Sequence, residues 1–285
     1  MSERRAEVSR LLIALGPQSE TALELASYLR VVGGEQAELL GLLVEDPRVA
    51  AHAGSRLARE IVLSGLERRL EPAGLERQLR ARAAQLRRRF EAAAAKLGSR
   101  HDFQVVRGEL LTEVLRAAER ADALIVDAAG APFAPSAWSL PDLQRLLRAA
   151  RRFLLIVREG WFSGREVLVV LTCEAEVRHA FAPVLATALQ IARETRSPLA
   201  VVLVCSAAPR TDRLARELGH AASLAGVPFE GVLTAPGLAV GERVTAVRRR
   251  HPRLVLLAGE SAEEETLVEA LLPRISSSLL WLKDA

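Results

Sequence analysis

The sequence predicts an α/β protein built from two tandem, doubly wound parallel sheets, each with five strands and with helices on both faces. Three observations carry this prediction. Short apolar runs alternate with amphipathic segments along the whole chain, and the alternation pauses once, around residues 159–164, and then restarts. The length of 285 residues also suits two compact domains. We therefore expect one domain over residues 1–159 and a second over residues 160–285.

In the first half, each apolar run is short enough for a buried strand and ends at glycine, proline or charged residues. The expected strands are residues 8–15, 39–44, 103–106, 123–127 and 153–157. A helix is expected from residue 19 or 20 to about Gly33. Further helices are expected over residues 75–97, 111–120 and 140–150, where apolar residues such as Leu86 and Phe90 recur at helical spacing.

The second half repeats the pattern after a linker near residues 160–164. The expected strands are residues 167–171, 199–204, 229–233, 254–258 and 279–282. The expected helices are residues 177–193, 210–224, 240–250 and 263–272. Because strands and helices alternate, both sheets should be parallel, with right-handed crossovers.

The composition excludes several classes of protein. Hydrophobic residues make up 50% of the chain and charged residues 26%, which excludes a mostly disordered protein. Two cysteines exclude a disulfide scaffold and a cysteine-rich zinc module. A net charge of +4 with only 4% aromatic residues argues against a dedicated nucleic-acid binder. No apolar run approaches the ~18–20 residues that span a bilayer, and the polar N-terminus is unlike a secretory signal, so a cytoplasmic protein is expected.

Local sequence adds a family resemblance that covers nearly the whole chain. The first half carries Leu12-Ile13-Ala14-Leu15, Gly41-Leu42-Leu43-Val44-Glu45-Asp46-Pro47, Val105-Val106-Arg107-Gly108-Glu109 and Ala121-Asp122-Ala123-Leu124-Ile125-Val126. The second half is weaker, chiefly in residues 199–204 and 254–259. Together with the order of elements, these segments resemble the universal stress protein family, as a tandem of two such domains.

The resemblance implies a strand order 3-2-1-4-5 in each sheet. It places a ligand crevice where strands 1 and 4 diverge at their carboxyl ends. Family members pair through their fifth strands, so residues 153–157 and 279–282 are expected to lie edge to edge as an internal pseudo-dimer, with further homodimerisation open. The implied role is non-enzymatic: stress-related regulation or scaffolding of other proteins.

The residues that would bind ATP depart from the family pattern in both halves. ATP-binding members carry an aspartate at the end of the first strand, where this chain has Gly16 and Thr172. They also carry spaced glycines after the fourth strand, which let backbone N–H groups approach phosphates. Gly130 lacks a second glycine after it, and Gly259 is followed by three glutamates, residues 263–265, which would repel a phosphate.

ATP or AMP is therefore not expected as a cofactor, although a nucleotide or small-ligand sensor with a non-standard cradle remains an alternative. The candidate crevice residues are Gly16, Val44, Gly108, Gly130, Thr172 and Gly259.

Cys173 and Cys205 each follow an expected strand of the second half, and His179 begins the helix between those strands. Two neighbouring carboxyl ends would bring the thiols together, so a redox pair or an incomplete metal site is one hypothesis. Two small buried residues at the ends of core strands are the other, and free cysteines commonly are such residues. We expect no bound metal.

Other polar features have simpler interpretations. Glu45, Asp46 and Glu109 follow strands and could form an acid pair, but loop acids are commoner, and we expect no enzyme. The arginine runs 87–89 and 248–250 could contact phosphates or anionic lipid, and solvated helix faces are the simpler interpretation. Residues 51–70 could form a lid, a dimer contact or ordinary packing.

Overall fold

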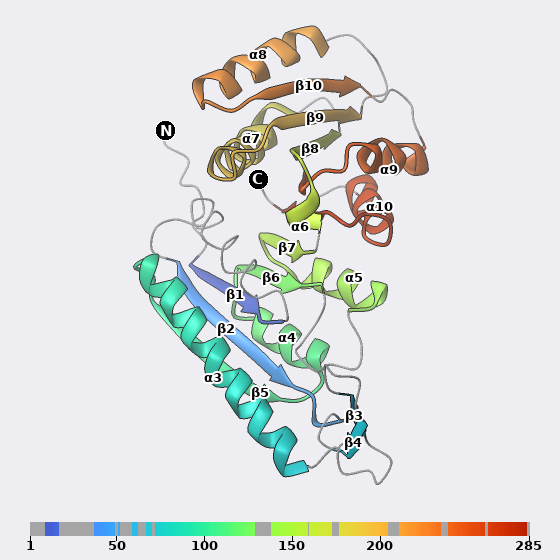
Figure 1. The fold of residues 1–285 in the computed structure, drawn as a ribbon. Coiled ribbons are helices and arrows are strands. Elements are labelled where there is room, and N and C mark those ends of the chain that lie inside the picture. Colours follow the sequence, from blue (N-terminus) through green and yellow to red (C-terminus); the bar gives the residue numbers. More distant parts are fainter. Residues whose placement is uncertain are drawn as a thin grey trace.

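The computed structural model describes residues 9–16, 37–48, 51, 59–61, 67–69, 72–128, 138–158, 160–172, 177–204, 211–234, 239–259 and 262–283 (Figure 1). The strands of the first half are β1 (Arg10–Ala14), β2 (Glu38–Glu45), β5 (His101–Arg107), β6 (Ala123–Asp127) and β7 (Phe153–Val157). Among the described residues of this half, the helices are α3 (Pro72–Lys96), α4 (Leu110–Ala118) and α5 (Leu140–Ala149). A separate antiparallel hairpin is formed by β3 (Arg59–Ile61) and β4 (Glu67–Arg69).

The second half begins after a single helical turn, α6 (Gly160–Ser163). Its strands are β8 (Val167–Thr172), β9 (Leu199–Val204), β10 (Phe229–Thr234), β11 (Leu254–Ala258) and β12 (Ser278–Leu282). Its helices are α7 (Val177–Glu194), α8 (Thr211–Leu224), α9 (Val240–Arg249) and α10 (Ala262–Leu271).

Ten strands form one continuous sheet in the order β10-β9-β8-β11-β12-β7-β6-β1-β2-β5. Within each half the strands lie in the order 3-2-1-4-5 and are parallel, which confirms the predicted fold. The halves join where β7 and β12 pair antiparallel, with Leu155 opposite Leu280 and Leu154 opposite Trp281. This antiparallel junction, here called the seam, is the predicted pairing of the two fifth strands.

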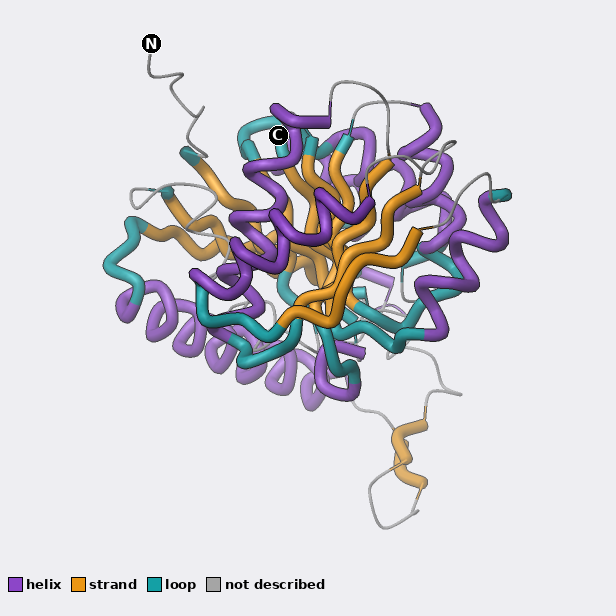
Figure 2. The backbone as a smooth tube through the Cα atoms, turned by 90° about the horizontal axis from the view of Figure 1, so that it is seen from above, coloured by secondary structure: helices purple, strands orange, loops and turns teal. Residues whose placement is uncertain are grey.

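Alternate residues of each strand feed two hydrophobic layers, as the two-residue period of a strand requires. Leu11 and Ile13 of β1 belong to the layer beneath α3, α7 and α8, whereas Leu12 belongs to the layer beneath α4, α5, α9 and α10. Helices accordingly cover both faces of the sheet (Figure 2). Each layer contains residues of both halves, so the seam does not interrupt the core.

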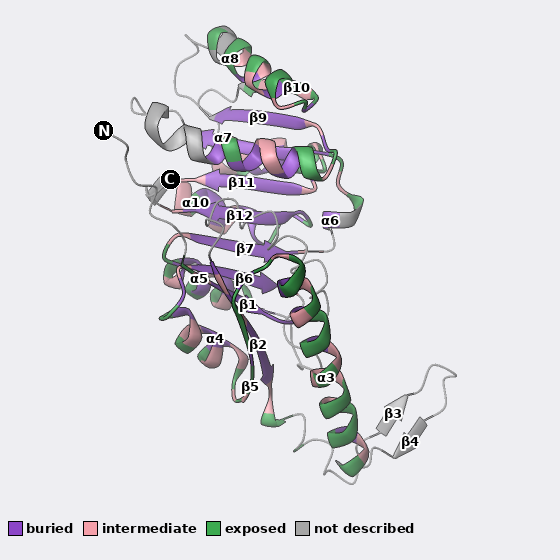
Figure 3. Cartoon of the chain, turned by 90° about the vertical axis from the view of Figure 1, so that its left-hand side faces the viewer, coloured by how far each residue is buried: buried purple, intermediate pink, exposed green. Residues whose placement is uncertain are grey.

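Burial explains why the central strands read as unbroken apolar runs. Every residue of β6, β7 and β12 is buried (Figure 3), and each of these strands contributes side chains to both hydrophobic layers. The edge strand β5 alternates differently, with most of its side chains exposed and Phe103 buried. At the opposite edge, the register of β10 shifts at Gly231, a bulge that interrupts a bare strand edge.

Polar contacts reinforce the seam from both sides. Arg158, which follows β7, donates from Nη1 to the carbonyl oxygen of Ile275 at 2.7 Å and from its backbone N–H to Ser278 Oγ at 3.0 Å. Arg148 of α5 forms an ion pair of 3.2 Å with Glu269 of α10. Because these bonds join residues more than a hundred positions apart, the two halves form a pseudo-dimer within one chain.

The carboxylate of Asp122 fixes the start of β1. Its Oδ2 accepts hydrogen bonds from the backbone N–H and hydroxyl of Ser9, both at 2.7 Å, and from the N–H of Arg10 at 3.0 Å. Burial opposes ionisation, but these hydrogen bonds and the charge of Arg152 outweigh it and lower the pKa of Asp122 below its ordinary value of 3.8.

We expect Asp122→Ala to lower the free energy of unfolding by about 1 kcal/mol at neutral pH, since the site is only partly buried. Because the pKa of Asp122 is lower in the folded protein than in the unfolded chain, the ionised carboxylate stabilises the fold at pH values above the unfolded pKa. This stabilisation is lost as the pH falls through the lower, folded-state pKa. Urea unfolding of both proteins should therefore show a difference at pH 7 that shrinks below pH 3.8. A pH-independent difference would contradict this account.

Two local elements differ from the sequence-based expectation. The linker near residues 160–164 contains α6, whose Trp161 is buried against the guanidinium of Arg253, 5.3 Å from the ring centroid. Part of the 51–70 segment forms the β3–β4 hairpin, which belongs to a separate sheet. The choice between lid, dimer contact and packing stays open for that segment, as does the expected domain boundary at residue 159.

Candidate functional site

The candidate site lies at the carboxyl ends of the parallel strands. In each half the first and fourth strands are neighbours, β1 with β6 and β8 with β11, and their crossovers leave in opposite directions along the sheet. This is the switch point where open α/β sheets bind ligands. The predicted residues Gly16, Val44, Gly108, Thr172 and Gly259 all lie at or just beyond carboxyl strand ends.

In the first half, Gly16 and Val44 are both buried. Val44 is only 2% exposed and packs in the layer that includes Leu12 and Val114. Leu15, between β1 and Gly16, donates its N–H to the carbonyl oxygen of Leu42 at 2.8 Å. These two predicted residues are therefore part of the buried interior at the carboxyl ends of β1 and β2.

The two acids at the end of β2, Glu45 and Asp46, each form an ion pair with an arginine. Arg48 donates to Asp46 from its backbone N–H at 2.8 Å and from Nη2 at 2.6 Å, and the Asp46 side chain is 5% exposed. The hydrogen bonds to Asp46 raise the pKa of the Arg48 guanidinium. Glu45 pairs with Arg107 of β5 at 3.3 Å. Both carboxylates are thus engaged in ion pairs, which suits a structural role better than proton transfer.

A tryptophan that sequence reasoning missed closes the end of β6. The Nε1–H of Trp138 donates to the carbonyl oxygen of Asp127 at 2.7 Å. The Asp127 side chain is buried, and Trp138 packs in the same layer as Val126. The apolar ring therefore covers the last residue of the fourth strand. Gly130, which was predicted for this loop, lies outside the described residues.

Glutamate side chains cover the two predicted glycines that precede helices. At Gly108, a Cβ atom would lie 2.7 Å from Oε1 of Glu113 in the first turns of α4. At Gly259, where φ is +146°, a Cβ atom would overlap the carboxylate of Glu264 in the first turn of α10. Each carboxylate thus occupies the space beside a bare backbone that a phosphate cradle would need.

The N-termini of the neighbouring helices are also capped by the chain itself. Ser139 and Asp142 form a capping box at α5, with Ser139 Oγ donating to Asp142 Oδ2 at 2.6 Å. At α9, Glu242 accepts a hydrogen bond of 3.0 Å from the backbone N–H of Ala239. Carboxylates near a helix N-terminus stabilise the helix dipole, and they make the same place unfavourable for another anion.

The second-half residues are only partly described. Thr172 is paired in register with Val204, so the residues that directly precede Cys173 and Cys205 are partners in neighbouring strands. Both cysteines lie outside the described residues. His179 belongs to α7, but its side chain is not among those described. The redox hypothesis therefore stays a prediction.

The structure thus sets two predicted glycines, one in each half, against glutamates that the sequence did not single out individually: Gly108 against Glu113 and Gly259 against Glu264. Within the described ranges, no group of three or more His, Cys, Asp or Glu residues is arranged to hold a metal ion. Of the helices described, none combines the length and the apolar character that crossing a membrane requires.

Comparison with known proteins identifies the fold. No family model matches the chain, and no curated protein matches its sequence. A universal stress protein from Archaeoglobus fulgidus DSM 4304 superposes with a TM-score of 0.58 at 14% identity, covering 97% of each chain. A protein from Pseudomonas aeruginosa UCBPP-PA14, assigned provisionally to the universal stress proteins, gives 0.56 at 17% identity over 98% of this chain and 94% of its own.

A third solved structure belongs to a different kind of protein. The cytoplasmic domain of a prokaryotic cation chloride cotransporter gives a TM-score of 0.54 at 11% identity, over 97% of this chain and 96% of that domain. All three likenesses extend over both halves. The predicted resemblance is thereby confirmed at the level of fold.

Proposed function

Because the chain has a universal stress protein-like tandem fold, we propose that it is a non-enzymatic member of this structural class, acting in stress-related regulation or as a scaffold for other proteins or a second copy of itself. We further propose that it lacks the class's nucleotide site. The observation that carries this proposal is the carboxylate of Glu264 seated against the bare backbone of Gly259.

Three features of the described crevices support the proposal. Glu264 places negative charge where a phosphate would approach the second half. In the first half, the corresponding helix α5 has Pro141 in its first turn and a capping box that uses Asp142, so fewer N–H groups are available to an anion. The acids at the rim, Glu45 and Asp46, are bound to Arg107 and Arg48. Charged groups that are already paired within the chain are not available for catalysis, so this surface suits contacts with other proteins better.

The proposal predicts that ATP binds no more tightly than the same phosphate chain without a nucleoside. Native mass spectrometry of the freshly purified protein should show no retained nucleotide. Calorimetric titration with ATP and Mg²⁺, and separately with tripolyphosphate, should give dissociation constants within about threefold of each other, or no binding up to about 1 mM. Retained nucleotide, or ATP affinity at least about tenfold above that of tripolyphosphate, would contradict the proposal.

A pair of variants tests whether the carboxylate of Glu264 is what weakens the binding of ATP. Glu264→Ser removes the carboxylate beside Gly259, and Glu265→Ser makes the same charge change one residue along α10. We expect Glu264→Ser alone to raise ATP affinity, by about fivefold for a single unfavourable charge. An equal effect of both variants would indicate a general charge effect instead.

A further inference from the structure

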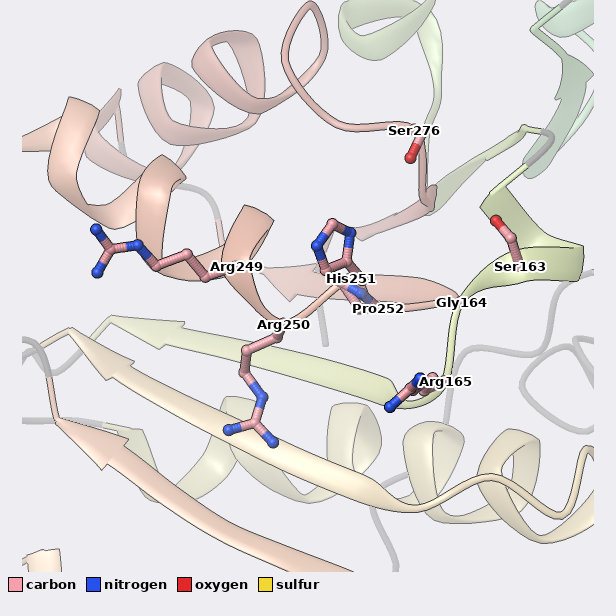
Figure 4. A pocket seen from close by; sticks show the side chains of 8 residues that line it. All are labelled: Ser163, Gly164, Arg165, Arg249, Arg250, His251, Pro252 and Ser276. Atoms are coloured by element: carbon pink, nitrogen blue, oxygen red, sulfur yellow. The ribbon is translucent and has the colours of Figure 1, made fainter.

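In the second half, the amino ends of the parallel strands carry a basic groove, on the opposite side from the carboxyl ends that the proposed function concerns. Two adjoining pockets of about 480 and 530 Å³ lie at the amino ends of β8, β11 and β12, and both are lined by Arg249, His251 and Ser276. Ser163, Gly164 and Arg165 complete the first pocket, which Figure 4 shows from close by. Volumes of this size suit a small ligand.

Charge distinguishes this groove from the pocket of the first half. Its lining contains Arg165, Arg248, Arg249, Arg250, Arg274 and His251, and no Asp or Glu among the described residues. A third pocket, in the first half, instead mixes three arginines with three acids, Glu38, Asp102 and Glu113. The second-half groove therefore has an excess of positive charge that lies within a concavity, where the potential is focused.

Two of the five arginines have structural partners. Arg250 forms a bidentate ion pair with the buried carboxylate of Glu166, and hydrogen bonding to Glu166 raises the pKa of Arg250. Arg274 donates to the carbonyl oxygen of Ala270 at 2.9 Å, which caps the end of α10. Within the part of the chain that the structure describes, no side-chain partner is found for Arg165, Arg248 or Arg249.

His251 lines both pockets of the groove. It follows α9 with φ of +48°, and its N–H donates to the carbonyl oxygen of Arg248. The same position is held by Gly98 after α3 and by Gly226 after α8, with φ of +62° and +68°, and by Arg196 after α7, with φ of +50°. Glycine therefore suits the backbone at position 251, and its substitution would remove the imidazole without straining the turn.

The side chains line one pocket. In Figure 4 the imidazole of His251 lies near the middle of the view, between Arg165 and Arg249, and the guanidinium of Arg249 extends away from it. The hydroxyls of Ser163 and Ser276 lie on the other side of the imidazole from Arg249. Guanidinium groups match the geometry of phosphate oxygens, and hydroxyl and imidazole N–H groups add hydrogen-bond donors. We propose that this groove binds a small soluble anion carrying two or more phosphate groups.

Tripolyphosphate serves as the probe, titrated calorimetrically into the full chain at about 0.1 M salt, where surface charges more than ~10 Å apart are largely screened. We expect saturable binding at one site. His251→Gly should weaken it about tenfold and leave the melting temperature equal or higher by roughly 2 °C, because glycine suits the backbone. Arg165→Glu/Arg249→Glu should weaken it by about 100-fold or more.

A matched control carries the same change of net charge on a distant helix. Arg77 and Arg88 are exposed on α3, and Arg77→Glu/Arg88→Glu should bind tripolyphosphate as the unmodified protein does. Equal loss in this control, or unchanged binding in both groove variants, would overturn the proposal. So would absence of binding by the unmodified protein at about 1 mM tripolyphosphate.

A final arm distinguishes a small anion from a nucleic acid. A single-stranded oligonucleotide that binds about 100-fold more tightly than tripolyphosphate and loses affinity in the groove variants would overturn the small-ligand assignment. None of these outcomes bears on the proposed function, which depends on whether the nucleoside of ATP adds affinity at the carboxyl edge of the sheet.

Discussion

Replacing Trp281 with alanine is expected to lower the free energy of unfolding by about 3–5 kcal/mol, the range for removing a large buried aromatic side chain. Trp281 is fully buried in β12, where its partners are Leu154 across the seam and Leu257 in β11. The substitution therefore removes packing from the contact between the two halves. Denaturant unfolding followed by circular dichroism measures it. Because each hydrophobic layer includes both halves, the variant should still unfold in one transition.

Trp281→Phe is the matched control for this experiment. The indole Nε1 of Trp281 is buried and has no hydrogen-bond partner among the described residues. Phenylalanine keeps an aromatic ring in the core and removes the unpaired N–H, whose burial is unfavourable by about 1–3 kcal/mol. These effects oppose each other, so the stability should stay within about 1 kcal/mol of the unmodified protein. A phenylalanine variant as unstable as the alanine variant would contradict this account, because it would show that the stability depends on the indole N–H group and not on an aromatic ring at this position.

Gly164→Ala is expected to lower the free energy of unfolding by about 2–4 kcal/mol. A Cβ atom at this position would lie 2.3 Å from both the Cα and the N of Arg253, and 2.6 Å from the carbonyl carbon of Pro252. All three are backbone atoms, so no side-chain rotation relieves the overlap. Gly164 directly precedes the strands of the second half, and the chain must separate there to accept a methyl group.

Gly241→Ala provides the comparison. Gly241 lies in the first turn of α9, and a Cβ atom there would meet nothing within 4 Å. Alanine favours a helix over glycine, so this variant should be as stable as the unmodified protein or more stable by up to about 0.5–1 kcal/mol. Thermal and urea unfolding of the two alanine variants give the result. Similar stability for both would contradict the close approach at Gly164.

The fold could be predicted because the central strands are buried on both faces and leave an unmistakable pattern. The predicted boundaries of β6, β7 and β11 match the structure residue for residue. The hairpin formed by Arg59–Ile61 and Glu67–Arg69 escaped prediction, since strands of three residues are too short to show a periodic pattern. The segment of α6 was expected as a linker, and in the structure it forms a helical turn whose Trp161 packs against Arg253, a residue distant in the sequence.

The candidate site could be predicted only in outline. The sequence placed three glutamates after Gly259, but which of them faces the glycine depends on the helix start and on a side-chain rotamer. Trp138 follows a loop of no clear pattern, so its bond to Asp127 had no sequence signal. The arginines around His251 looked like a solvated helix face, because the concavity is formed by Ser163 and Ser276 from distant parts of the chain.

The seam between β7 and β12 has a consequence for how the two halves can differ. Asp122 and Arg253 occupy equivalent positions, each directly before the fourth strand of its half, yet one binds the start of β1 and the other stacks on Trp161. In a dimer of identical subunits, both positions would carry the same residue. Joining the halves in one chain also makes their association independent of protein concentration. The amino ends of the second-half strands can therefore carry a positively charged groove while the pocket of the first half carries both charges.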